Sequence, residues 1–199
     1  LIETPKQLFT RVAVHAALPS IFYDARVFDL NASQTPFPTE GFDEVSEAGK
    51  ISLGQYTLNR WHLDGVKRMY DRFNRQKNMK VSWSAMLSML KKGDFSKHEQ
   101  TATTFIDAMT HRVFMPNTPA IANFGAHLVM GSACFVLDVG DTMEEIMDTL
   151  KATALIHKSG GGTGFNFSKL RPEGDFVSTT KGTASGPLSF MRLFDTMTD

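Results

Sequence analysis

The chain has 199 residues, of which 42% are hydrophobic, and its 21 lysines and arginines balance its 21 aspartates and glutamates. This length and apolar content suffice for one or two globular domains, whereas the balanced charge gives no argument for binding nucleic acid or a membrane surface. A single cysteine excludes an internal disulfide framework and a cysteine-only zinc site, so a reducing, cytoplasmic setting is expected. No apolar run has the length needed to cross a bilayer, and the N-terminus lacks the pattern of a signal peptide.

The first predicted element is a helix that begins after Thr4. Thr4 suits the N-cap position, Pro5 suits the first helical position, and Gln7 has the spacing of a capping box. Apolar residues keep helical spacing until Pro19 interrupts the pattern. Residues 29–54 are rich in Pro, Gly, Ser, Thr and acidic residues, and are predicted to form an ordered loop outside the core.

Three further helices are predicted from apolar stripes. The stripes are Val66, Met69, Tyr70 and Phe73; Trp83, Met86, Leu87 and Leu90; and Ala102, Phe105, Ile106, Met109 and Val113. Gly93 is expected to end the second of these helices, and Ser96 to start the third. Basic residues surround the first stripe, but Asp64 and Asp71 are interleaved with them, which favours a solvated helix face over a nucleic-acid surface.

The pattern changes after the third stripe. Residues 114–120 contain two prolines and are predicted to form a loop, because proline is excluded from a helix interior. Residues 134–137 are apolar and β-prone, and are predicted to form a buried strand. A helix should follow, capped by Asp141 or Thr142, and its inner stripe is Met143, Ile146, Met147, Leu150 and Ala154.

A glycine-rich run follows this helix at residues 158–167, and its last three residues, 165–167, are predicted to form a second strand. The run lacks the lysine position of a Walker loop and the third glycine of a dinucleotide fingerprint. On its own it would indicate only a tight turn. The order strand, helix, strand predicts a βαβ unit and the start of a parallel sheet or barrel, and a last helix is expected from residues 185–187.

Five segments in this half of the chain together resemble the catalytic subunit of ribonucleotide reductase. They are residues 115–119, 131–137, 159–166, 169–172 and 182–187. Their sequences most closely resemble those of the adenosylcobalamin-dependent class II enzymes. The resemblance is specific from about residue 112 to residue 199, and over residues 1–111 only the helical layout fits.

The resemblance implies an α/β fold in two parts. Residues 1–111 would form a mainly helical region, and residues 112–199 would form the first strands and helices of a ten-stranded α/β barrel that is incomplete in this chain. The family's radical cysteine, its active-site asparagine and glutamate, and the cysteine partner of Cys134 would all lie beyond Asp199. The chain is therefore expected to be one portion of the enzyme, truncated at its C-terminus and inactive alone.

The resemblance also assigns the residues that contact substrate. Cys134 matches one of the two reducing cysteines that deliver electrons as the ribose 2′ hydroxyl leaves, and Thr118, Ala133 and Gly162 match ribonucleotide contacts. Read without the family, a lone cysteine on a strand is a small hydrophobe, and Thr118 is a turn residue.

A second group of residues matches the site of the deoxynucleotide effector that sets substrate choice. This group is Asp141, Thr142 and Arg171, although Asp141 could equally be only a helix cap. The implied cofactor is adenosylcobalamin, whose contacts would lie mostly outside this chain, and no metal ligands are assigned. The implied partners are the ribonucleotide, the effector, the rest of the barrel and a second copy in a homodimer, with neither nucleic acid nor membrane.

Two alternatives remain open from the sequence. The chain could belong to a class I reductase, in which a subunit with a metal-linked radical replaces cobalamin. It could also be a non-catalytic module, a helical region plus a βαβ unit that binds a nucleotide effector or a partner chain.

Overall fold

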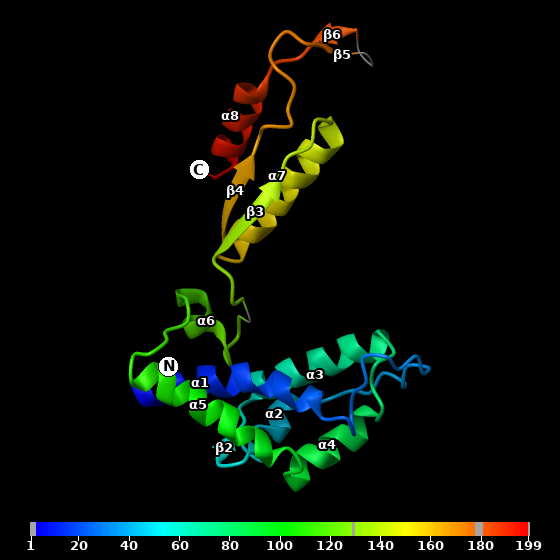
Figure 1. Cartoon of the computed structure of the whole chain (residues 1–199), viewed down its shortest axis with the longest axis vertical. Coiled ribbons are helices and arrows are strands. Elements are labelled where there is room, and N and C mark those ends of the chain that lie inside the picture. The colour runs from blue at the N-terminus through cyan, green and yellow to red at the C-terminus, as the bar shows by residue number, and fades with distance from the viewer. Residues whose placement is uncertain (1–2, 129, 178–180, 199) are drawn as a thin grey trace. The chain divides into compact units, whose positions relative to one another are not determined.

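The computed structural model describes residues 3–128, 130–177 and 181–198 and separates into two compact units, Leu1–Gly131 (unit 1) and Ser132–Asp199 (unit 2). The division falls later in the chain than the predicted boundary between residues 111 and 112. The reason is helix α6 (Thr118–Asn123), which contacts α1 (Pro5–Ala17) and so belongs with the helices that precede it. Figure 1 shows the elements of each unit.

Unit 1 is helical with one small hairpin. The capping box predicted at Thr4 and Gln7 is present at the start of α1. The other elements of the unit are the 3₁₀ helix η1 (Leu18–Tyr23), α2 (Glu44–Glu47), β1 (Ser52–Leu53), β2 (Tyr56–Thr57), α3 (Arg60–Arg75), α4 (Trp83–Lys92), η2 (Ser96–His98) and α5 (Glu99–Thr110). The three predicted central helices are confirmed as α3, α4 and α5, and Gly93 ends α4 in the left-handed conformation that favours glycine.

The main core of unit 1 lies among η1, α3, α4 and the hairpin. Trp83, Tyr70 and Met86 are at most 2% exposed there. The predicted loop at 29–54 contributes to this core, contrary to expectation, because Ile51 and Leu53 are each 1% exposed and pack against it. Its polar composition gave no sign of the short helix α2, or of Ile51 and the strand β1 that follows it.

Two other details of the predicted helices differ in unit 1. Val113 was assigned to the third stripe, but α5 ends at Thr110 and the Val113 side chain is 81% exposed. Residues 114–120 were predicted as a loop, but α6 begins at Thr118. Pro119 is compatible with a helix there because its missing N–H falls in the first turn, where no intrahelical partner exists. On α3, Asp64 and Asp71 form i,i+4 ion pairs with Arg68 and Lys67, as a solvated face requires.

Unit 2 contains the predicted βαβ unit. Strand β3 (Cys134–Asp138), helix α7 (Met143–Lys158) and strand β4 (Gly162–Asn166) follow in order, and the two strands pair in parallel. Thr142, one of the two predicted caps, accepts a hydrogen bond from the Glu145 N–H at the start of α7. An unpredicted hairpin of β5 (Phe176–Val177) and β6 (Gly182–Thr183) precedes the last helix, α8 (Pro187–Thr198).

The β3–β4 sheet is covered on one face only. Phe165 of β4 packs against Phe194 of α8 with ring centroids 4.6 Å apart, beside Ile146 of α7. No helix among the described residues of unit 2 covers the opposite face, so β3 was wrongly predicted to be a buried strand, and Val136 is 87% exposed. The inner stripe predicted for α7 is also partly wrong, since Ile146 is buried whereas Met143 and Met147 are 55% and 42% exposed.

The glycine run divides into a turn and a strand. Gly160 has a φ of +84°, which glycine adopts without strain, directly after α7 ends. A Cβ on Gly161 would lie 2.8 Å from Ile156 Cγ2 and 2.9 Å from Phe135 Cε2, so packing requires a glycine there. Gly162 and Gly164 already belong to β4, which begins earlier than the predicted strand at 165–167. Neither has a positive φ or a contact below 3.7 Å for an added Cβ.

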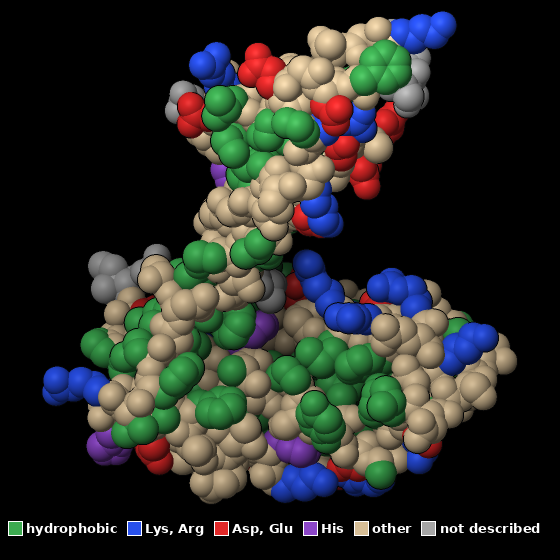
Figure 2. Space-filling view, turned by 45° about the horizontal axis from the view of Figure 1, so that its top comes forward, with side chains coloured by type: hydrophobic (Ala, Val, Ile, Leu, Met, Phe, Trp, Pro, Cys, Tyr) green, Lys and Arg blue, Asp and Glu red, His purple; other side chains and the backbone are tan. Residues whose placement is uncertain are grey.

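Large hydrophobic side chains remain exposed in both units, and patches of them are visible on the face shown in Figure 2. Within the described ranges, none of the helices combines the length and the apolar character required to cross a membrane.

His62 joins α3 to α1 through its two ring nitrogens. Its side chain is buried, and Nδ1 accepts a hydrogen bond from the Asn59 N–H at 3.2 Å. Because a backbone N–H can only donate, Nε2 carries the proton and donates to the Arg11 carbonyl oxygen at 3.0 Å. Burial lowers the pKa of His62 from 6.5 to about 4.

We expect the free energy of unfolding of unit 1 to fall as the pH decreases from 6.5 to about 4, since the unfolded chain binds a proton at His62 before the folded chain does. The contribution is at most about 1.4 kcal/mol per pH unit. Urea unfolding followed by tryptophan fluorescence measures it, because both tryptophans, Trp61 and Trp83, belong to unit 1. His62→Gln should lower the slope, His111→Gln at an exposed histidine should not, and an unchanged slope in His62→Gln would contradict the assignment.

The two halves of the glycine run should respond differently to alanine. Gly161→Ala introduces a clash with Ile156 and Phe135 and should destabilise unit 2 by about 1–3 kcal/mol. Gly164→Ala meets nothing within 4 Å and should change stability by less than about 0.5 kcal/mol. Hydrogen exchange of the β3 and β4 amides measures both variants, and equal loss of protection in the two would show that the division is wrong.

Candidate active site

The pairing of β3 with β4 brings three of the predicted substrate-contact residues together. Cys134 is the first residue of β3, is exposed, and stands opposite Gly162 in the parallel register. The Gly162 N–H donates a hydrogen bond of 2.6 Å to the carbonyl oxygen of Ala133. The thiol therefore lies at the strand end that adjoins the glycine turn.

Side chains alternate between the two faces of this sheet. The uncovered face, called the open face below, carries Cys134, Val136 and Asp138 on β3 and Gly162, Gly164 and Asn166 on β4. On the covered face, His157 of α7 and Thr163 of β4 share a hydrogen bond of 2.8 Å between Nε2 and Oγ1. This bond attaches the glycine strand to the last turn of the helix that precedes it.

The composition of the open face is suited to close approach by a ligand. Gly162 and Gly164 project no side chain over β4, and neither glycine is required by its own φ or by packing within the described chain. Beside them stands an accessible thiol, which can donate a proton and can be oxidised to a disulfide. A small molecule lying on this face would touch backbone and sulfur together.

A second group of predicted residues lines a pocket of about 550 Å³ in unit 2. Asp141, Thr142 and Arg171, assigned above to the effector site, all belong to it. The remaining lining residues are Met143, Glu144, Ile146, Leu170, Val177, Thr183, Ala184, Ser185, Gly186 and Phe190. The pocket is thus built from the start of α7, the segment after β4, the β5–β6 hairpin and the start of α8.

Asp141 and Arg171 form the charged pair of this pocket. The Asp141 carboxylate accepts hydrogen bonds from the Arg171 backbone N–H at 3.0 Å and from its Nε at 2.7 Å. The backbone hydrogen bond, aided by the guanidinium, lowers the pKa of Asp141 and keeps it ionised. Among the described residues only Nε of the guanidinium is engaged, which leaves its terminal nitrogens available to a ligand anion.

Thr118 lies in unit 1, whereas the other predicted site residues lie in unit 2. It is the first residue of α6 and is exposed, and the Asn117 side chain caps the helix by accepting a hydrogen bond from the Ala120 N–H at 3.3 Å. Pro119 has no N–H and the Ala120 N–H is bound by Asn117, so the polar groups that Thr118 itself offers at this helix start are its hydroxyl and its own backbone N–H.

Several residues of these sites were not identified from the sequence. Val136 and Gly164 share the open face with Cys134, and their spacing of two from Cys134 and Gly162 was the available signal. Ser185 and Glu144 line the pocket of Asp141, but they come from different elements. No local pattern marks them, because only the folded chain brings α7 and α8 to one pocket.

Comparisons with known proteins identify the family of this chain. The chain matches the family described as ribonucleotide reductase, all-alpha domain, over residues 1–128, and the family described as ribonucleotide reductase, barrel domain, over residues 132–199. These two matches meet close to the division between unit 1 and unit 2. They also extend the likeness across the N-terminal region, where the sequence motifs were weak.

Three relatives illustrate the range of similarity. The vitamin B12-dependent ribonucleoside-diphosphate reductase of Thermoplasma acidophilum is 40% identical over 100% of this chain, which covers 24% of that protein. The enzyme of the same description from Mycobacterium tuberculosis is 46% identical over 47% of this chain and 14% of its own length. The ribonucleoside-diphosphate reductase large chain of Neurospora crassa is 35% identical over 44% of this chain and 10% of its own length.

The chain thus spans about a quarter of the Thermoplasma relative and smaller fractions of the other two. Both family matches and the relative that covers the whole chain agree on one assignment. The chain belongs to the family of ribonucleotide reductase large subunits, with all-alpha-domain sequence in unit 1 and barrel-domain sequence in unit 2.

Proposed function

We propose that this chain is the part of a ribonucleotide reductase that supplies one reducing thiol and the glycine backbone beside it as one surface of the substrate site. The observation that carries the proposal is the register of Cys134 with Gly162, which sets an exposed thiol beside backbone that has no Cβ. In the complete enzyme the β3–β4 pair would be the first two neighbours of a ten-stranded α/β barrel. The helical unit 1 would precede that barrel.

The reaction replaces the ribose C2′–OH bond with a C2′–H bond. The Cys134 thiol donates a proton to the departing hydroxyl, which leaves as water, and its sulfur then forms one half of a disulfide. Two thiols together supply two electrons and two protons, of which one proton leaves in the water and the other ends in the new C2′–H bond, so the second thiol comes from outside this chain, which has one cysteine. For the same reason the chain alone is expected to be inactive.

Thr118 and Ala133 would complete the substrate contacts that this chain offers. Thr118 presents its hydroxyl and its own backbone N–H, and Ala133 is the residue whose carbonyl orients the Gly162 amide. A ribonucleotide has polar groups for both, since its hydroxyls and phosphates accept and donate hydrogen bonds.

The names of the Thermoplasma and Mycobacterium relatives support cobalamin as the source of the radical, in preference to a partner subunit with a metal-linked radical. Most contacts with adenosylcobalamin would come from the part of the enzyme outside this chain.

The pocket of Asp141 is proposed as the effector site for a deoxynucleoside triphosphate. Arg171 is the one cationic residue among those that line it, and it retains free guanidinium nitrogens for a phosphate. Glu144 and Glu145 already oppose the positive end of the α7 dipole, so Arg171 and not the helix terminus is the anion-binding group. The complete enzyme is expected to act as a homodimer.

Replacing the thiol tests the catalytic assignment. In a full-length reductase that contains this chain, Cys134→Ser should lower dithiol-dependent ribonucleotide reduction by at least about 10²-fold, because serine neither forms a disulfide nor donates its proton as readily. The assay measures deoxynucleotide formation with adenosylcobalamin present.

Unchanged affinity for a deoxynucleoside triphosphate would show that the Cys134→Ser protein is folded. Full turnover in this variant would refute the role of Cys134. Turnover by the wild type without cobalamin, but with a metal-radical subunit, would assign the chain to the other class. Effector binding without any turnover by the wild type would favour a non-catalytic nucleotide-binding module.

Arg171→Lys tests the effector site, because lysine keeps the charge but loses the planar set of donors. The Kd for a deoxynucleoside triphosphate should rise about tenfold, which corresponds to about 1.4 kcal/mol. Calorimetric titration of the full-length protein measures it. Arg192→Lys, on an exposed position of α8, is the matched control, and equal affinity in the two variants would exclude Arg171 from the site.

A further inference from the structure

Arg11 of α1 connects the N-terminal end of unit 1 to the short helix α6. Its Nε and Nη2 donate hydrogen bonds of 2.8 and 2.9 Å to the two carboxylate oxygens of Glu3. Its Nη2 also donates to the carbonyl oxygen of Ile121 at 3.3 Å, and its Nη1 donates to the carbonyl oxygen of Phe124. One guanidinium therefore binds a carboxylate and two carbonyls at the C-terminal end of α6.

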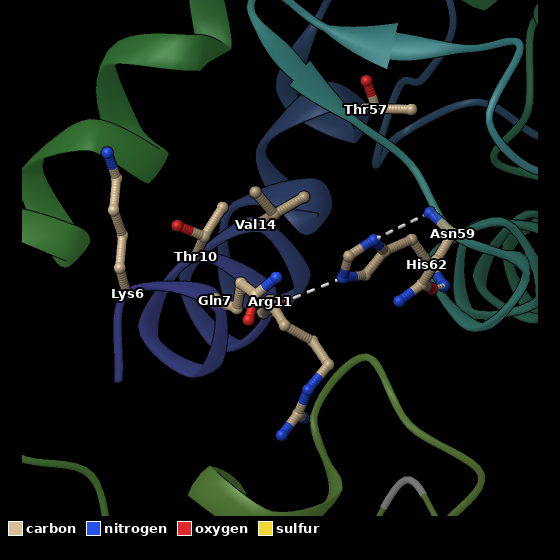
Figure 3. Close-up of a pocket in the computed structure, with 8 residues that line it drawn as sticks. All are labelled: Lys6, Gln7, Thr10, Arg11, Val14, Thr57, Asn59 and His62. Carbon is tan, nitrogen blue, oxygen red and sulfur yellow. Dashed lines mark hydrogen bonds between the residues drawn. The ribbon is translucent and has the colours of Figure 1, made fainter. Parts of the chain in front are cut away.

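The Arg11 side chain is only 12% exposed, and Glu3, which balances its charge, is 25% exposed. Figure 3 shows the side chain extending from α1 away from His62, while the Arg11 backbone carbonyl faces the His62 ring. The two carbonyls that it binds are not used by the helix itself, because the last carbonyls of a helix have no intrahelical donor. Arg11 thus satisfies groups that would otherwise be left without a partner.

The chain that follows α6 is held from the other side by α3. Asn59 Nδ2 donates a hydrogen bond of 3.0 Å to the carbonyl oxygen of Gly125, while Asn59 Oδ1 caps α3. Gly125 has a φ of +70°, and a Cβ there would lie 2.5 Å from His62 Nε2 and 2.8 Å from Arg11 Cγ. The segment 121–125 is therefore seated closely on both α1 and α3.

A helix of six residues depends on such contacts. It forms too few internal hydrogen bonds to be stable in isolation. Asn117 secures its first turn, Ala120 is buried beneath it, and Arg11 and Asn59 hold its far end. Thr118, at the start of this helix, is exposed and forms none of these anchoring bonds, so its position is set by residues other than itself.

We propose that Arg11 is a positioning residue for the ribonucleotide: by holding the C-terminal carbonyls of α6, it fixes the place of Thr118. The inference rests on the proposed function of Thr118 as a substrate contact. Arg11 acts on the substrate through α6 and does not touch it. Lysine cannot replace it, since one ammonium cannot serve the carboxylate and two separate carbonyls in this geometry.

The test compares Arg11→Lys with Arg75→Lys in a full-length reductase that contains this chain. Arg75 is exposed at the end of α3, and no hydrogen bond or ion pair engages its side chain within the described ranges. Arg11→Lys should speed hydrogen exchange at the amides of residues 120–126 and raise KM for the ribonucleotide about tenfold, with kcat changed less than about twofold. Arg75→Lys should change none of these.

Asn59→Asp provides a second variant should Arg11→Lys fail to fold. It retains the oxygen that caps α3 but removes the donor to Gly125, so it should also speed exchange in residues 120–126 and raise KM. A double variant decides whether the effect passes through Thr118. Thr118→Ala combined with Arg11→Lys should show the KM of Thr118→Ala alone, because both act on one contact.

Additive effects in that double variant, or faster exchange with an unchanged KM, would overturn the positioning role. Unchanged exchange in both Arg11→Lys and Asn59→Asp would overturn it as well. These results differ from a failure of the proposed function. In that case the wild-type enzyme would reduce no ribonucleotide at all, whereas the exchange comparison would still show whether Arg11 holds α6.

Discussion

The parallel pairing of β3 with β4 is the interaction on which the candidate active site depends. Its register places Cys134 opposite Gly162 and continues without a break to Asp138 and Asn166. Parallel strands need a crossover, and α7 provides it while covering one face of the pair. The other face is uncovered in the described part of unit 2, with a thiol at one end and glycine backbone beside it.

The glycine run has two structural roles, a turn after α7 and two strand positions without a side chain, and its sequence does not show which glycine has which role. Gly160 and Gly161 are needed by the turn itself, one for its backbone angle and the other for the space taken by Ile156 and Phe135. Gly162 and Gly164 are not needed by the turn or by the strand. Their lack of side chains matters for the open face, where it leaves the backbone beside Cys134 uncovered.

In unit 1, polar contacts from α1 and from the N-cap of α3 hold the α6 segment. The buried His62 stays neutral because burial lowers its pKa, so its ring can link α3 to α1 without a buried charge. Arg11 is buried with its charge balanced by Glu3 and donates to α6. Arg11 and Asn59 hold residues 121–125, and the Asn123 side chain donates to the Met130 carbonyl oxygen, so this stretch groups with the helices and not with the sheet.

The sequence by itself determined α1, α3, α4 and α5, the βαβ order and the family, because apolar periodicity, caps and local motifs are properties of neighbouring residues. It singled out Cys134, Gly162, Asp141 and Arg171 as candidate site residues, but not the strand register or the hydrogen bonds in which they take part. Only the tertiary structure decided that Ile51 and Leu53 enter the core, that Val136 faces solvent, and that Asp141 binds Arg171. Each of these features depends on which elements pack against one another, and that packing is determined jointly by residues far apart in the chain.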